Sequence, residues 1–185
     1  MKIACIFNMN SNMFTIARFL RDKGYDAHLL LMNEDDHFLP KADSFTEEYR
    51  SFTHYLDWWP KEPLPDGRWT NVTPRKLRKD LKDYDVLIGC GFAPAFIEYS
   101  GRQMDLFIPY GSDFYEVPFK KMWPARKNTI NNLYPALQKK GIENSKYVVF
   151  DYTTEQEPVF KKFDFNSLAP ASSSAVKISF TVASA

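Results

Sequence analysis

The first 32 residues constrain the fold most, because two apolar runs flank an amphipathic segment there. Residues 3–7 and 27–32 are apolar apart from His28, whereas apolar side chains recur at helical spacing between Met13 and Leu20. Runs of this kind are typical of strands buried on both faces, and the spacing between them is typical of a helix. A strand, a helix and a second strand form a right-handed crossover between parallel strands. The sequence therefore predicts a parallel sheet covered by helices.

The same alternation continues through most of the chain. The later strands are predicted at residues 86–88, 106–110 and 147–150. The later helices are predicted at residues 74–81, 94–99 and 124–140. Gly141 is expected to end the last helix, and residues 33–71 are interpreted as an irregular excursion with short helices. The fold class that follows is α/β, a Rossmann-like and mostly parallel sheet with helices on both faces.

A chain of 185 residues is long enough for one domain with a substantial core. We assign residues 1–165 to this domain. Residues 166–175 form a linker of small residues, and apolar and polar residues alternate from Val176 to Val182. Residues 166–185 therefore end either in a strand with one buried face or in a frayed tail.

Charge and cysteine content narrow the functional class. The formal net charge of +1 provides no field for a polyanion, so we expect no nucleic-acid partner. Cys5 and Cys90 both lie in apolar runs, where a thiol usually behaves as a small buried hydrophobe. A reducing, cytoplasmic location fits such thiols. The sequence shows no recognisable signal peptide and no apolar stretch of membrane-spanning length.

Several familiar chemistries lack their motifs in this chain. The loop at residues 8–12, after the first predicted strand, contains no glycine, so the dinucleotide-binding pattern G-x-G-x-x-G is absent there. The phosphate-binding pattern G-x-x-x-x-G-K-[ST] and the nucleophile elbow G-x-S-x-G are absent as well. His28, His37 and His54 have no metal-ligand spacing. We therefore expect neither a metal nor a cofactor.

Four segments together resemble a known family. They are KIACIFN at residues 2–8, RDKGYD at 21–26, DVLIG at 85–89 and IPYGSD at 108–113. In their order and spacing they are similar to the amino-terminal half of family-4-type glycosyltransferases with the GT-B fold, over about residues 1–160.

The resemblance implies a two-domain enzyme that transfers a sugar from a nucleotide-sugar to a glycan or lipid-linked acceptor. The first domain of such an enzyme holds the acceptor, and the second holds most of the donor. The family's donor motif, two glutamates separated by seven residues, is absent from this chain. We therefore expect an acceptor-binding domain that needs a second lobe or another copy of itself for catalysis. The alternative is a non-catalytic Rossmann-like module that binds a nucleotide, a sugar or another protein.

The resemblance also assigns candidate residues to the cleft between the two lobes. They lie in three loops and are Asn10, Ser11, Asn12, Gly91, Phe92, Gly111, Ser112 and Asp113. Amide and hydroxyl groups of these residue types can hydrogen-bond the hydroxyls of an acceptor. The simpler account is helix capping for Asn12 and Asp113, and a plain strand-to-helix turn for the Gly91 loop.

Two further groups of residues are candidates for ligand or membrane contact. His54, Trp58 and Trp59 offer sugar stacking or polarisation of a hydroxyl, although large aromatic side chains more often roof a sheet. Cations mix with aromatic residues between positions 119 and 127. This patch gives a weaker prediction of peripheral contact with the inner face of a membrane, through Lys120, Lys121, Trp123 and Arg126.

Overall fold

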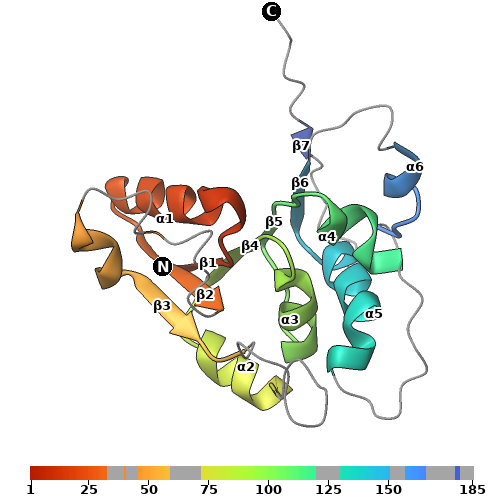
Figure 1. The fold of residues 1–185 in the computed structure, drawn as a ribbon, viewed down its shortest axis with the longest axis horizontal. Helices are drawn as coiled ribbons and strands as arrows, with labels where there is room; N and C mark the ends of the chain where they lie inside the picture. Colours follow the sequence, from red (N-terminus) through yellow and green to blue (C-terminus); the bar gives the residue numbers. More distant parts are fainter. Residues whose placement is uncertain are drawn as a thin grey trace, which may run out of the picture.

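The computed structural model describes residues 1–32, 40, 46–58, 72–119, 130–150, 157–165 and 178–179. Their centre is a parallel sheet with the strand order β3-β2-β1-β4-β5-β6-β7 (Figure 1). The strands are β1 (Lys2–Ile6), β2 (Asp26–Met32), β3 (Thr53–Leu56), β4 (Val86–Gly89), β5 (Leu106–Phe107), β6 (Tyr147–Phe150) and β7 (Ile178–Ser179). The first six follow the doubly wound order 3-2-1-4-5-6. The predicted Rossmann-like α/β class is therefore confirmed.

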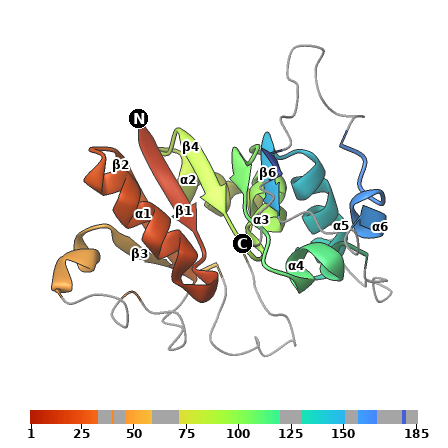
Figure 2. The ribbon, with the colours of Figure 1, turned by 90° about the horizontal axis from the view of Figure 1, so that it is seen from above.

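Helices cover both faces of this sheet. They are α1 (Asn12–Asp22), α2 (Pro74–Leu81), α3 (Ala93–Ser100), α4 (Ser112–Tyr115), α5 (Ile130–Glu143) and α6 (Glu157–Phe160). The described residues also include the 3₁₀ segments η1 (Met9–Ser11), η3 (Glu47–Ser51) and η4 (Val117–Phe119). Figure 2 shows α1 on the near side of the sheet, with α2 and α3 behind it. None of the described helices is long and apolar enough to cross a bilayer.

The side chains of β1 alternate between two apolar cores. Ile3 and Cys5 pack with Phe14 of α1 on one face. Ala4 and Ile6 pack on the other face, in the core that α2 and α3 help to build. These four residues of β1 are all buried. A strand buried on both faces needs an apolar residue at every position, which explains the uninterrupted apolar run in the sequence.

One strand was missed by the sequence pattern. Residues 33–71 were expected to be irregular, but β3 lies within them and pairs with β2 in parallel, with Leu29 opposite Thr53 and Met32 opposite Leu56. The prediction was wrong here because β3 is a short edge strand with an exposed centre. Its sequence, Thr-His-Tyr-Leu, therefore carries no continuous apolar run.

The structure also changes the ends of two predicted elements. Gly141 does not end α5, which continues to Glu143, and the predicted start of that helix at residues 124–129 lies outside the described residues. A Cβ atom at position 141 would collide with the backbone carbonyl of Pro94, so this glycine permits close packing of α3 against α5. The strand predicted at residues 106–110 is only two residues long. Within residues 166–185, the described residues Ile178 and Ser179 form β7, which pairs with β6 in parallel.

Candidate functional site

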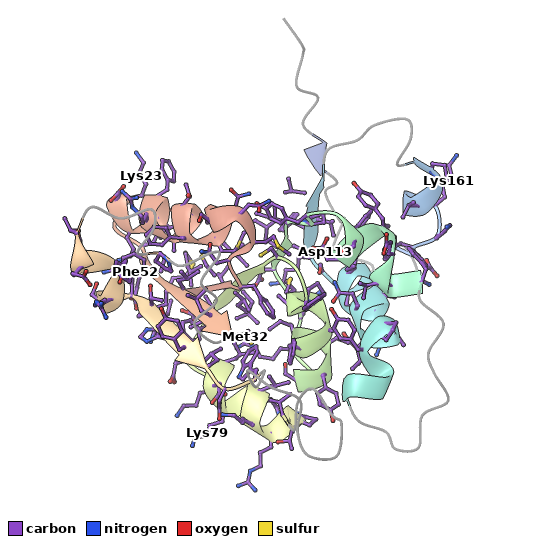
Figure 3. The ribbon with its side chains drawn as sticks, in the orientation of Figure 1. Lys23, Met32, Phe52, Lys79, Asp113 and Lys161 are labelled. Carbon is purple, nitrogen blue, oxygen red and sulfur yellow. The ribbon has the colours of Figure 1, made fainter. Side chains whose placement is uncertain are left out.

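Three loops follow the carboxyl ends of neighbouring central strands. They are residues 7–12 after β1, residues 90–92 after β4 and residues 108–111 after β5. Because β1, β4 and β5 are adjacent and parallel, their carboxyl ends meet at one edge of the sheet. Open α/β sheets bind ligands at this edge. Figure 3 labels Asp113, the second residue after the third loop.

The loop after β1 adopts backbone conformations that are usually left to glycine. Phe7, Asn10 and Ser11 have φ values of 66°, 51° and 59°. Each such residue costs roughly 1 kcal/mol, and strain of this kind persists only where the surroundings hold it. The Phe7 N–H is held by the carbonyl of Leu30 at 2.9 Å. The start of this loop is therefore tied to β2, although the loop lacks glycine.

The cap of α1 comes from an unexpected residue. Capping by Ser11 or Asn12 was the simpler account of this loop, but the Ser11 side chain makes no capping hydrogen bond. Instead, the side-chain oxygen of buried Asn8 accepts from the backbone N–H of Phe14 at 2.9 Å. Asn10 and Asn12 are exposed. Capping therefore does not account for the Asn12 side chain, which stays available to a ligand.

The loop after β4 is packed tightly against its neighbours. Gly91 has a φ of 55°, and its carbonyl accepts a hydrogen bond from the Gln138 side chain at 2.9 Å. The Phe92 ring meets the rings of Phe7 and Tyr134 edge to face, at centroid distances of 6.3 and 5.1 Å. Phe92 thus joins the first two loops to α5 and acts as a packing residue.

Asp113 holds the loop after β5 in place. Its Oδ1 accepts from the backbone N–H groups of Tyr110 and Gly111 at 3.0 and 2.8 Å. Burial raises the pKa of Asp113, and this effect outweighs its backbone hydrogen bonds from Tyr110, Gly111, Gly91 and Phe114. The carboxyl group thus holds the shape of the edge through its hydrogen bonds with backbone N–H groups. Neighbouring Ser112 is exposed.

Gln138 is a site residue that sequence reasoning missed. Its side chain is fully buried and donates to the carbonyls of Gly91 and Asp113, at 2.9 and 3.0 Å. It also accepts from the backbone N–H of Ala95 at 3.2 Å. One amide therefore ties the loop after β4, the start of α3 and the start of α4 to α5. A glutamine in a helical pattern gives no sign of this role.

Two phenol groups near Asp113 complete the edge. The hydroxyls of Tyr110 and Tyr134 are buried and have no hydrogen-bond partner within the described structure. Burial raises the pKa of Tyr110 to about 12 and raises that of Tyr134 as well, and the Asp113 charge adds to both shifts. Both hydroxyls are therefore neutral donors. Tyr110 lies in a segment that carries the family resemblance, whereas nothing in the sequence pointed to Tyr134.

The aromatic candidates lie elsewhere. Trp58 is fully buried, stacks on Phe96 at 5.6 Å between centroids, and donates through Nε1 to Asp80 at 2.8 Å. Its ring belongs to the core and offers no open face to a sugar, as the simpler account expected. His54 lies on edge strand β3, with β2 between it and β1. Trp59 lies outside the described residues.

The predicted membrane-contact patch and the cavities lie away from these loops or outside the described residues. The membrane-contact patch, Lys120, Lys121, Trp123 and Arg126, lies outside the described residues. No group of three or more metal-ligating side chains occurs among the residues that are described. A cavity of about 290 Å³ lies between α1 and η3, lined by residues that include Arg18, Arg21 and Tyr49, and a second of about 270 Å³ is lined by residues around Arg102. Both lie outside the three loops.

Comparisons with known proteins show a fold likeness only. No protein-family model matches the chain, and no curated protein matches it. One similar solved structure is UGT73P12 of Glycyrrhiza uralensis in complex with glycyrrhetinic acid 3-O-monoglucuronide, with 12% identity, a TM-score of 0.43, and coverage of 87% of this chain and 46% of that one. Another is a structure from work on pinoresinol-lariciresinol and phenylcoumaran benzylic ether reductases, with 14% identity, a TM-score of 0.43, and coverage of 82% and 49%. The chain thus spans about half the length of each.

Proposed function

We propose that this chain is the acceptor-binding domain of a GT-B-type glycosyltransferase, and that it holds a hydroxyl-rich acceptor at the loops after β1, β4 and β5. The observation that carries the proposal is the pair of buried, unpartnered hydroxyls of Tyr110 and Tyr134 at this edge. A buried polar group without a partner is costly, so such groups commonly mark a place for a ligand or an ordered water.

The chemistry of the edge suits neutral hydroxyl groups. The side chains of Asn10, Asn12 and Ser112 are exposed there and can both donate and accept hydrogen bonds. The two phenols add donors inside the edge, and the Asp113 carboxylate makes the surroundings unfavourable for a second anion. A sugar acceptor offers alternating donors and acceptors of this kind. The nucleotide-sugar would come from a second lobe, on the same or another chain.

Binding measurements on phenol variants test this proposal. Titration of the protein with neutral oligosaccharides, followed by backbone amide NMR shifts, should move the signals of the three loops. Tyr110→Phe and Tyr134→Phe remove only the hydroxyls, and each should weaken binding about three- to tenfold. Neither should lower the free energy of unfolding, because each removes a hydroxyl that has no partner. Tyr147→Phe, at an exposed position on β6, is the matched control and should leave binding unchanged.

A non-catalytic binding module is the second candidate, and one observation favours it. Asp113 is buried at this edge and accepts hydrogen bonds from backbone N–H groups, so it has a structural role in the loop. Assays of the purified chain with nucleotide-sugars separate the two functions. Binding of an oligosaccharide without transfer, and transfer restored by a donor-binding lobe, supports the acceptor domain. Tight binding of free nucleotides with no effect of a second lobe supports the module, and transfer by the chain alone contradicts both.

A further inference from the structure

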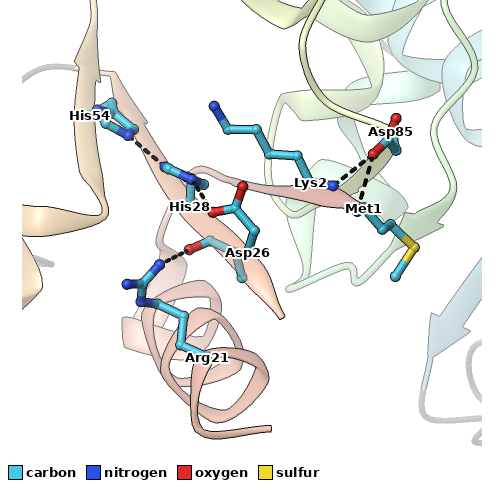
Figure 4. Close-up of polar contacts among 8 residues, drawn as sticks. Met1, Lys2, Arg21, Asp26, His28, His54 and Asp85 are labelled. Carbon is cyan, nitrogen blue, oxygen red and sulfur yellow. Dashed lines mark hydrogen bonds and ion pairs between the residues drawn. The ribbon is translucent and has the colours of Figure 1, made fainter. Parts of the chain in front are cut away.

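Three ionisable side chains form a continuous hydrogen-bonded chain on strands β2 and β3, at the β3 edge of the sheet (Figure 4). His28 of β2 contacts Asp26 Oδ1 through Nε2 at 2.8 Å, and it contacts Nε2 of His54 through Nδ1 at 2.7 Å. The two imidazole rings are nearly parallel, with 19° between their planes and 4.9 Å between their centroids. At this separation the short N···N contact joins the two rings edge to edge. Because His54 is on edge strand β3, the contact fastens that strand to β2.

The chemistry of the three groups fixes where the protons lie. The Asp26 carboxylate only accepts, so Nε2 of His28 must carry a proton. Nδ1 of a neutral His28 is then an acceptor, and Nε2 of His54 must be the donor. Two neutral imidazoles thus satisfy both hydrogen bonds. One added proton leaves both bonds intact, because a His28 that carries protons on both nitrogens donates from Nδ1 to Nε2 of a neutral His54, and the second proton is then the one that Nε2 of His54 takes up. A second proton would place two N–H groups face to face across 2.7 Å, and the contact would break.

The surrounding charges make this second proton expensive. Burial lowers the pKa of His54, and the charges of His28 and Lys2 lower it further. Lys2 of β1 lies over the Tyr84 ring, and that ring meets His28 edge to face. Two acidic side chains oppose these positive charges. The pKa of Asp26 is lowered mainly by its hydrogen bond to His28, and the charge of Asp83 adds to the raised pKa of Tyr84. Arg21 of α1 lies near Asp26 and donates to the carbonyl of Ala27, so it adds another positive charge.

We propose that the chain formed by Asp26, His28 and His54 is a pH-sensitive latch, which holds β3 on the sheet above neutral pH and releases it in acid. The latch tolerates one proton and opens with the second. Strand β3 directly follows η3, and Tyr49 and Phe52 beside it line the cavity against α1. Opening the latch therefore frees the outer edge of β2 and loosens one wall of this cavity. The proposal does not depend on the proposed acceptor site.

The sign of the effect follows from the direction of the His54 shift. The folded state binds the proton on His54 more weakly than the unfolded state does, because the pKa of His54 is lowered on folding. The contribution of the latch is therefore complete above the ordinary histidine value of 6.5 and declines as the pH falls through the lowered pKa. Acid, rather than alkali, should loosen β3.

Amide hydrogen exchange of β3, corrected for intrinsic rates and compared with β1, tests the latch between pH 8 and pH 5. Protection of residues 53–56 should fall roughly tenfold in acid relative to β1 in the wild type. His54→Gln should remove this pH dependence, because its amide can turn and either donate to or accept from His28. His54→Phe should lower protection at every pH. Tyr55→Phe, at a neighbouring exposed position on β3, is the control and should behave as the wild type.

NMR titration of the histidine side chains supplies a second measurement, with His37→Gln used to simplify the spectrum. The His54 signal should titrate below the ordinary histidine value, and the His28 signal should respond to the same step because the two rings share a hydrogen bond. Constant protection of β3 between pH 8 and pH 5 would overturn the proposal. So would an unchanged pH dependence in His54→Gln, or two independent titrations at ordinary histidine values.

Discussion

Replacing Gly141 by alanine tests whether the contact between α3 and α5 positions the candidate site. A Cβ atom at position 141 would meet the carbonyl carbon and oxygen of Pro94 well inside contact distance, and it would lie 3.0 Å from the Pro94 Cβ. Two of these three atoms are backbone atoms, which cannot turn aside as a flexible side chain can. The two helices must therefore move apart, and α5 carries both Tyr134 and Gln138.

The size of the effect is the difference of two terms. Overpacking costs about 1–3 kcal/mol, and we take the upper end, about 3 kcal/mol, because the clash is with backbone atoms. Alanine in place of glycine inside a helix returns about 1 kcal/mol. We therefore expect Gly141→Ala to lower the free energy of unfolding by about 2 kcal/mol. In a protein of this size, this corresponds to a fall of about 4–8 °C in Tm.

Urea unfolding followed by circular dichroism measures this change. Gly24→Ala is the matched control, because Gly24 has a φ of 84° and no atom within 4 Å of an added Cβ. It should cost only the left-handed backbone strain, about 1 kcal/mol. Gly141→Ala should also weaken oligosaccharide binding, whereas Gly24→Ala should not. A Gly141→Ala protein as stable as the wild type, or more stable, would refute the close-packing argument.

The remaining predictions concern buried polar groups. Gln138→Leu should lower the free energy of unfolding by about 3 kcal/mol, measured by urea unfolding, because it leaves several buried backbone groups without partners. The raised pKa of Asp113 means that its stabilising contribution is complete below pH 3.8 and is lost as the pH rises through the raised value. The stability of wild type minus Asp113→Asn, measured from pH 3 to pH 7, should therefore fall with pH, and a difference that rises would contradict the shift. Burial raises the pKa of Cys5 and of Cys90 to about 12, so a thiol reagent at pH 8 should label neither until urea is added; rapid labelling of the native protein would contradict this.

The location of much of the candidate site could be predicted from the parallel sheet, because the loops after parallel strands meet at one edge. The positions of Asn10, Asn12 and Ser112 at the carboxyl edge follow from strand order, because each lies in or beside the loop after a predicted strand. What these residues do there could not be read in the same way. Asn8 replaced Ser11 and Asn12 as the cap of α1, because its side chain reaches a backbone N–H six residues away.

Local pattern by itself determined the parallel α/β class, the central strands β1, β2, β4 and β6, and the start of α2 at Pro74. These elements are specified by neighbours in sequence, since a buried strand needs a continuous apolar run and a helix needs apolar residues at its own period. Tertiary structure alone decided the pairing of β3, the role of Gly141 and the burial of Gln138. Each depends on contact between residues far apart in the chain, namely β3 with β2, Gly141 with Pro94 and Gln138 with Gly91. The latch between His28 and His54 belongs to the same class, because only the pairing of two strands brings the two imidazoles together.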